Sequence, residues 1–385
     1  MDSNLYNENL LIHGGLAVKE KLPAVIPTEE FESLQQTLII SETAFNYILQ
    51  KEENSPRYVK IFPVQSTSMA CSVRKLDAVN ALIVIPLGVI ARIRVLARLL
   101  LKYWNASYNI GILNSPLDNI PENSWVIPEK LKPLLGSYLP GEEKKFWQDI
   151  NELDKSIGLP EAYDNDVSEL LHLALVHLAS HEFAHFWQKH FELLKLGLTP
   201  KQLKKYDLTQ LKIEKGVELH ADNVAGQLSM DILLTQVMIS YPSNDYDAYS
   251  RGFLRLSYIT TLIFSLYDPR RKYLLAYDRN LYTHPLVRRH LIFQASDDRL
   301  KERGPELHNH WQANELHGWT KCMQALNDLN LDCLKGDFGP VDLSKNIFPI
   351  HINPGGSVSF NFIGDMVNDS NIIKVNFIKL LADKL

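Results

Sequence analysis

Two histidines and a glutamate lie within five consecutive residues, His181-Glu182-Phe183-Ala184-His185, in the pattern HExxH. Residues four apart share one face of an α-helix, one turn from each other. His181 and His185 can therefore both direct an imidazole nitrogen at one ion, and zinc takes such ligands at about 2.0–2.1 Å. Glu182, one position further round the helix, can reach a metal-bound water and accept its proton as general base.

The residues that flank this motif are apolar. Leu173-Ala174-Leu175-Val176 precede it and Phe186-Trp187 follow it, which predicts a largely buried helix from about residue 165 to Leu196, ended by Gly197 and Pro200. Polar side chains in a buried helix need partners, because their burial without partners is costly. A metal would supply those partners. The alternative is a chance HExxH on a solvated helix face.

A third ligand candidate lies on the next expected helix, about residues 213–239. Glu218 follows His185 by 33 residues and would complete a His2Glu zinc site, with the fourth position open for water as in catalytic sites. Asp222 is one turn further on the same face, where it could accept the second N–H of His181 or His185 and fix its tautomer. The alternative is that Glu218 and Asp222 belong to an ordinary charged helix face.

HExxH followed by ExxxD on a second helix resembles the gluzincin metallopeptidases. The form Glu218-Leu219-His220-Ala221-Asp222 looks most like the ExxAD signature of the heat-shock-protease X and CAAX prenyl protease family. That family often has an NA-containing strand upstream and a later HP followed by a basic residue. Asn80-Ala81, His284-Pro285 and Arg288 or Arg289 occupy comparable places.

The resemblance covers roughly residues 77–295. It implies a zincin-like core and zinc-dependent hydrolysis of peptide bonds. Members of the family are typically membrane-embedded or lipoprotein-like, whereas the longest apolar run here, Ala81–Ala91, is about half of the ~20 residues that cross a bilayer. A soluble relative is implied, or a separate lineage such as the phage-exclusion Lit peptidase group, and both possibilities stay open.

The tetrahedral oxyanion of such a reaction needs a donor besides zinc. By family analogy His284 is the first candidate, and Arg288, His220 and Tyr282 are the others. The strand expected at Asn80–Ile85 could align a peptide substrate by β-addition if one of its edges is free, or it could be buried as its continuous apolar character suggests.

The other histidines have simpler interpretations. His177 could lie behind the ligand histidines, but the favoured interpretation is a core histidine with a backbone partner. His172 and His190 are expected to be peripheral. A second metal at His308, His310 and His317 is the less favoured alternative, because HxH ligands converge on a strand but diverge on a helix.

The predicted fold class is α+β and mostly helical, with a zincin-like metallopeptidase core. We expect an N-terminal mixed α/β region (1–75), a zincin-like catalytic domain (76–300), and a C-terminal helical and β region (301–385). Strands are predicted at 57–64 and 80–85. Further helices are predicted at about 89–104, with its arginines opposite its apolar side, at 249–267, 283–300 and 305–335, and a small β element at 357–363.

Composition narrows the function classes. The formal net charge of −5 argues against a general nucleic-acid binder, which usually carries a basic face. Three cysteines without a CxxC pair, and an N-terminus without a basic and then apolar segment, favour a cytoplasmic protein. The leading prediction is a soluble zinc metallopeptidase with a protein or peptide substrate and no membrane span. The alternatives are a non-catalytic zinc-stabilised sensor or scaffold and a zinc hydrolase of a non-peptide substrate.

Overall fold

The apolar run that follows Asn80 lies in the centre of a small sheet. The computed structural model describes residues 3–52, 57–108, 134, 141–159, 161–240, 246–267, 285–328 and 358–385. Within this part, β1 (Tyr58–Val64), β3 (Asn80–Pro86) and β2 (Ser72–Lys75) form a sheet in the order β1-β3-β2. β3 is parallel to β1 and antiparallel to β2. Its side chains are buried after the first residue, as expected for a strand covered on both faces.

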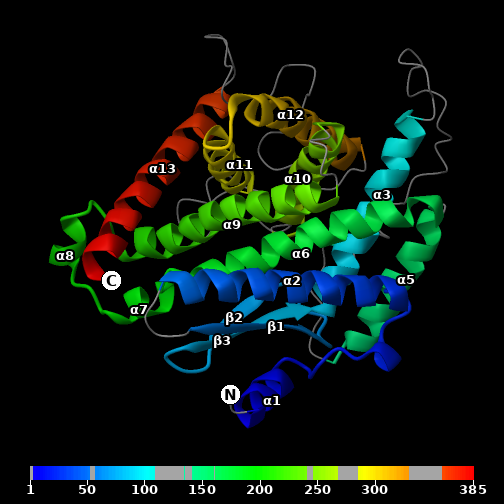
Figure 1. Ribbon diagram of the computed structural model, residues 1–385, viewed down its shortest axis with the longest axis horizontal. Coiled ribbons are helices and arrows are strands. Elements are labelled where there is room, and N and C mark those ends of the chain that lie inside the picture. The colour runs from blue at the N-terminus through cyan, green and yellow to red at the C-terminus, as the bar shows by residue number, and fades with distance from the viewer. Residues whose placement is uncertain are drawn as a thin grey trace.

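Helices make up most of the described chain. Figure 1 shows the long helices α6 and α9 side by side across the middle of the molecule, with α2 and the sheet on one side and α11, α12 and α13 on the other. The helices are α1 (Ser3–Ile12), η1 (Lys19–Lys21), α2 (Thr28–Glu52), α3 (Leu87–Tyr108), α5 (Glu143–Ile157), η5 (Glu161–Tyr163), α6 (Asp164–Trp187), α7 (His190–Lys195), α8 (Pro200–Lys204), α9 (Gln210–Ser240), α10 (Tyr246–Tyr267), α11 (Pro285–Lys301), α12 (Pro305–Asp328) and α13 (Val358–Lys384).

The main buried core includes Phe31, Phe183 and Trp311, and so draws on all three regions expected from the sequence. The division into those regions stays a prediction. The α+β class and the dominance of helix are confirmed.

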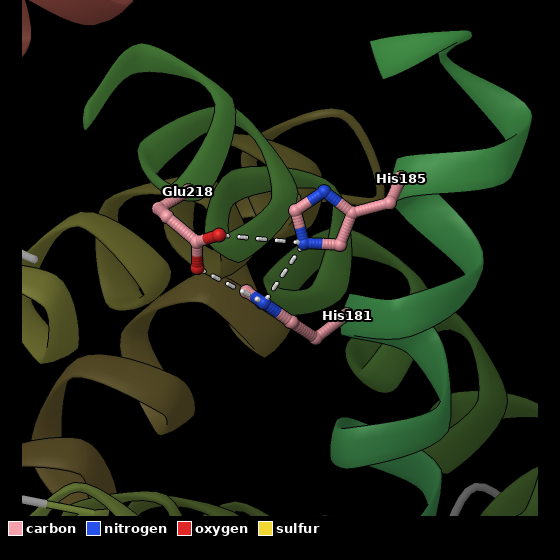
Figure 2. A group of neighbouring side chains, drawn as sticks. All are labelled: His181, His185 and Glu218. Atoms are coloured by element: carbon pink, nitrogen blue, oxygen red, sulfur yellow. Dashed lines mark hydrogen bonds and ion pairs between the residues drawn. The ribbon is translucent and has the colours of Figure 1, made fainter. Parts of the chain in front are cut away.

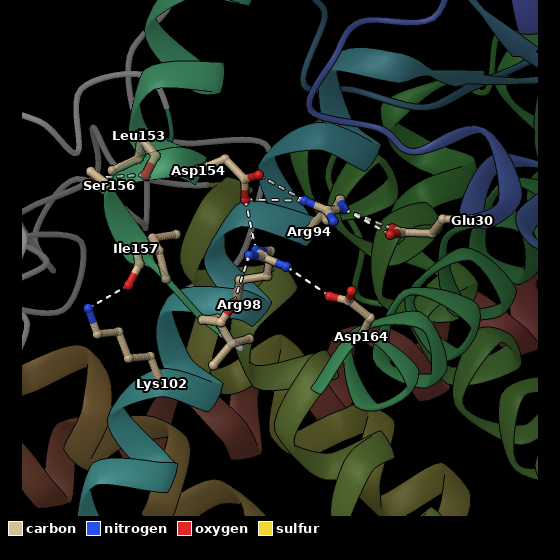
Figure 3. A network of polar contacts seen from close by, with 10 residues as sticks. Glu30, Arg94, Arg98, Lys102, Leu153, Asp154, Ser156, Ile157 and Asp164 are labelled. Atoms are coloured by element: carbon tan, nitrogen blue, oxygen red, sulfur yellow. Dashed lines mark hydrogen bonds and ion pairs between the residues drawn. The ribbon is translucent and has the colours of Figure 1, made fainter. Parts of the chain in front are cut away.

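The arginine side of α3 is buried against neighbouring helices. Arg94 donates to Glu30 of α2 at 2.9 Å and to Asp154 of α5 at 3.1 Å (Figure 3), and its side chain is 4% exposed. Arg98 contacts Asp154 and Asp164 at 3.0 and 2.9 Å. Buried charges persist when they are paired and hydrogen-bonded. Helical periodicity predicts that the arginines lie opposite the apolar side of α3. It does not predict that they are buried against carboxylates of other helices.

The β element expected at residues 357–363 is wrong. From Val358 these residues open α13, which packs against α9 and α11. Alternation of apolar residues is a weak strand signal, because packing decides between the two structures. Further along the same helix, Phe377 is fully buried and fills the space above Gly216 of α9.

None of the helices in the described ranges combines the length and apolar character that a bilayer span requires. Cys71 and Cys322 are buried, in line with the usual behaviour of lone cysteines as small apolar residues.

Candidate metal centre

The motif helix α6 ends at Trp187, nine residues before Leu196, where the sequence predicts its end. Lys189 has a left-handed backbone with φ of 54°. The buried Arg57, just before β1, donates to the carbonyl oxygens of Phe186 and Trp187. Carbonyls in the last turn of a helix lack helical partners. The arginine therefore satisfies two of them and fixes the end of the motif helix against the sheet.

Three side chains from two helices meet at one point. His181 and His185 project from α6, and Glu218 reaches them from α9 (Figure 2). The two Nε2 atoms are 3.2 Å apart. Glu218 places Oε2 3.5 Å from His181 Nε2 and Oε1 3.8 Å from His185 Nε2. The side chains are 11–16% exposed, so the cluster is largely enclosed yet reachable from solvent.

The spacing of these atoms fits zinc. In a tetrahedral site with ligands at about 2.0–2.1 Å, neighbouring ligand atoms lie roughly 3.3–3.4 Å apart. The two histidine–carboxylate separations are slightly wider than this value, and the histidine–histidine separation is slightly shorter. Two imidazoles and one carboxylate match the His2Glu donor set of catalytic zinc sites, which keeps a fourth position open. Among the described residues this is the one His/Cys/Asp/Glu group with metal-binding spacing.

Asp222 orients His181 from behind. Its Oδ1 is 3.0 Å from His181 Nδ1, and its side chain is 1% exposed. Arg288 of α11 donates to both Asp222 oxygens at 2.6 and 2.8 Å and lies 3.7 Å from Glu218. Burial would raise the pKa of Asp222, but Arg288 and His181 outweigh it and hold that pKa well below its usual range. Asp222 is therefore an anionic hydrogen-bond acceptor at neutral pH.

The pKa values of His181 and His185 differ widely, although both side chains belong to the same cluster. Burial lowers the pKa of His181, but its contacts with Asp222 and Glu218 prevail and raise it to about 10. Burial lowers the pKa of His185 to about 4. The protonated form of His181 is thus favoured without metal, and its Nε2 lies 3.2 Å from His185 Nε2 and 3.5 Å from Glu218 Oε2. A cation in the cluster would replace that proton.

Glu182 lies next to the cluster and near the edge of the sheet. Burial raises the pKa of Glu182 to about 7, against the lowering by His181. Its carboxylate accepts the backbone N–H of Val73 in β2. A carboxylate with a pKa near neutrality can both accept and release a proton at physiological pH, as general acid–base catalysis requires.

Of the four candidate oxyanion donors, only Arg288 is seen close to a ligand side chain within the described ranges. His284 and Tyr282 lie outside the described residues. Arg288 is engaged by Asp222 but has one nitrogen near Glu218. His220 is buried and contacts His190, so it does not line the ligand cluster.

The structure agrees with the predicted burial of His177 and contradicts the sequence prediction for His190. His177 is buried, as predicted, but its partner is a side chain rather than the backbone: its Nδ1 lies 3.3 Å from Ser229 Oγ. His190 is not peripheral: its side chain is fully buried, and it lies 3.0 Å from both His185 and His220. The left-handed turn at Lys189 points it back towards α6. No glycine or proline marks that turn in the sequence.

Three further histidines, His172, His308 and His310, each contact a different side chain away from the cluster. His172 contacts Ser33 at 3.0 Å. His308 contacts Asp297 at 2.6 Å, and His310 contacts Ser250 at 3.1 Å. His317 is exposed on α12. In the described ranges no second metal-binding group includes them.

The strand expected to meet a substrate has no free edge. β3 pairs with β1 on one side and β2 on the other, so its burial is the correct alternative.

The sequence prediction missed β2, whose four residues include two basic ones. β2 is the edge strand next to α6, and the N–H of Val73 is directed at Glu182 rather than at β3.

Buried histidines predict acid lability of the metal-free protein. Burial lowers the pKa to about 4 in four of them: His177, His185, His220 and His290. Between pH 6.5 and 4 the unfolded chain binds more protons at these sites, so folding stability falls as pH falls through this window. The raised pKa values of Glu182 and Glu30 act in the opposite direction but belong to only two groups. We expect urea unfolding midpoints to fall steadily from pH 7 to 4.5.

The variant His177→Asn isolates one contributor outside the metal cluster, since an amide can still bond Ser229. Its stability should depend less steeply on pH, by up to one proton or about 1.4 kcal/mol per pH unit. An unchanged slope between pH 6.5 and 4.5 would contradict burial of a neutral His177.

Comparisons with known proteins do not place the chain in a family. No family model matches it, and the searches of curated proteins and of solved structures give no match. The gluzincin resemblance therefore stays a prediction, and the functional argument depends on the geometry of His181, His185, Glu218 and Glu182.

Proposed function

We propose that this protein is a zinc-dependent hydrolase that cleaves peptide bonds. The observation that carries the proposal is the cluster of His181, His185 and Glu218, whose ligand atoms lie 3.2–3.8 Å apart, beside the part-buried general-base candidate Glu182. These three side chains would hold the metal. When bound, zinc polarises the scissile carbonyl and lowers the pKa of a bound water to about 7.

The protein's own groups divide the remaining work. Glu182 takes the proton from the attacking water and passes it to the leaving amine, and its pKa of about 7 suits both transfers. Asp222 holds His181 in the orientation that keeps Nε2 directed at the cluster. Arg288, 3.7 Å from Glu218, is the described cation nearest to the ligands and a candidate to stabilise developing negative charge.

A peptide substrate is favoured by the position of β2 as well as by the family resemblance. An extended peptide adds to an exposed sheet edge through main-chain hydrogen bonds. β2 is an edge strand that contacts α6, and the backbone N–H of Val73 in β2 bonds Glu182. A strand paired there would lie next to the general base.

Metal content and metal dependence test the proposal. Purified protein should contain about one zinc per chain by elemental analysis, the number that a single His2Glu site binds. It should cleave members of a panel of unfolded proteins, lose that cleavage on chelation and regain it with added zinc. A His185→Gln variant should contain little zinc and show no cleavage. Wild-type protein that binds no zinc, or cleaves equally well after chelation, would overturn the proposal.

A zinc-stabilised sensor or scaffold remains the competing function. It shares the metal site with the hydrolase but requires no general base. Zinc binding without cleavage of any protein in the panel would favour it, and new cleavage termini in cells that express the wild type but not Glu182→Gln would exclude it.

A further inference from the structure

Three histidine rings form a line that leads away from the metal cluster. His185 Nδ1 is 3.0 Å from His190 Nδ1, and His190 Nε2 is 3.0 Å from His220 Nδ1. The rings come from α6, α7 and α9, and all three residues are buried. Phe377 of α13 packs against the rings of His190 and His220, with centroids 5.7 and 5.8 Å away, and covers the outer end of the line.

Proton positions along this line are coupled. A neutral imidazole has one N–H donor and one acceptor nitrogen. If His185 offers the Nε2 lone pair to the cluster, its proton is on Nδ1 and is donated to Nδ1 of His190. His190 then carries its proton on Nε2 and donates it to Nδ1 of His220. The reverse order would place a proton on Nε2 of His185 and block that nitrogen as a ligand.

One order therefore satisfies both contacts and keeps His185 ready for metal. The two ligand histidines are thus supported in different ways. His181 has an anionic carboxylate behind it, whereas His185 has an imidazole, which fixes the ring without adding charge.

We propose that His190 and His220 are positioning residues of the zinc centre, and that their hydrogen-bonded line holds His185 in the tautomer that presents Nε2 to the metal. This proposal rests on the proposed function only in that the cluster binds zinc. Partners of ligand histidines typically change metal affinity by about 10–100-fold when they are removed.

Three substitutions at one position separate hydrogen bonding from packing. In His190→Asn the side-chain oxygen takes the place of Nδ1 and can accept from His185. In His190→Gln the amide nitrogen takes the place of Nε2 and can reach only His220. His190→Leu fills much of the space with neither contact. Zinc affinity is measured by competition with a chromophoric chelator, and folding of each metal-free variant by circular dichroism.

We expect His190→Gln and His190→Leu to weaken zinc binding by about 10–100-fold and His190→Asn to stay within a few fold of wild type. If the Leu variant does not fold, the zinc affinities of the Asn and Gln variants alone are compared. A Gln variant that is folded and binds zinc as tightly as wild type would overturn the proposal, and so would equal loss in Asn and Gln. A wild type without zinc affinity would instead refute the proposed function.

Nuclear magnetic resonance of 15N-labelled histidines gives a second readout that packing alone would not produce. In metal-free wild-type protein, His190 should carry its proton on Nε2 and accept at Nδ1, and His185 should be protonated on Nδ1. A His190 protonated on Nδ1 would overturn the proposed order whatever the zinc affinities.

Discussion

Replacement of Glu182 by glutamine should lower the rate of peptide-bond hydrolysis by about 10²–10⁴-fold, the contribution typical of a positioned general base. Glutamine keeps the shape of the side chain and can still contact the N–H of Val73 through its oxygen, but it cannot accept the water proton. Because Glu182 is not among the three ligand side chains, zinc content should be unchanged. Initial cleavage rates and metal analysis of the same preparations measure both effects.

A matched control is Glu152→Gln, which makes the same chemical change at an exposed position on α5. It should leave both rate and zinc content at the wild-type level. Equal rates for wild type and Glu182→Gln, with zinc present in both, would show that any hydrolysis does not pass through this group.

The second large effect is expected at Asp222. In Asp222→Ala, Arg288 loses its carboxylate partner and His181 loses its acceptor. Removing one member of a buried ion pair typically costs about 3–5 kcal/mol, and loss of the partner of a ligand histidine lowers metal affinity by about 10–100-fold. Urea unfolding of the metal-free protein measures the first effect, and chelator competition measures the second.

The double variant Asp222→Ala with Arg288→Met separates the two effects. Removal of the unpaired guanidinium should restore much of the folding stability, because an apolar group of similar length takes its place. Zinc affinity should stay low, since His181 still lacks its acceptor. Asp222→Asn keeps one acceptor oxygen and should bind zinc more tightly than the alanine variant. If the double variant recovered full zinc affinity, Asp222 would act on the protein's stability alone.

The local parts of the site could be predicted because helix geometry determines them. The i, i+4 spacing of His181 and His185 brings their rings together on any helix, and the ExxxD spacing places Glu218 and Asp222 on one face of α9. That α9 packs on α6 is a tertiary fact. It was predicted only because two histidines in a buried helix require a further ligand.

The features that the sequence did not predict are a turn, a short strand and a long-range ion pair, none of which has a recognisable local sequence pattern. The end of α6 was placed too late because the chain turns at Lys189, a residue type with no turn preference, and His190 was misjudged for the same reason. β2 is four residues long with Arg74 and Lys75, so it lacks the apolar alternation that identifies a strand. Arg288 is bound to Asp222 across 66 residues, a pairing that helical spacing alone does not predict.

The position of Phe377 has a consequence for the order of events during synthesis. The candidate ligands His181, His185 and Glu218 are translated long before this phenylalanine, which belongs to α13. Phe377 fills the space above Gly216 and covers His190 and His220. A nascent chain that has released α6 and α9 from the ribosome therefore exposes the histidine line to water. The dry environment behind His185 is completed only when α13 emerges and docks.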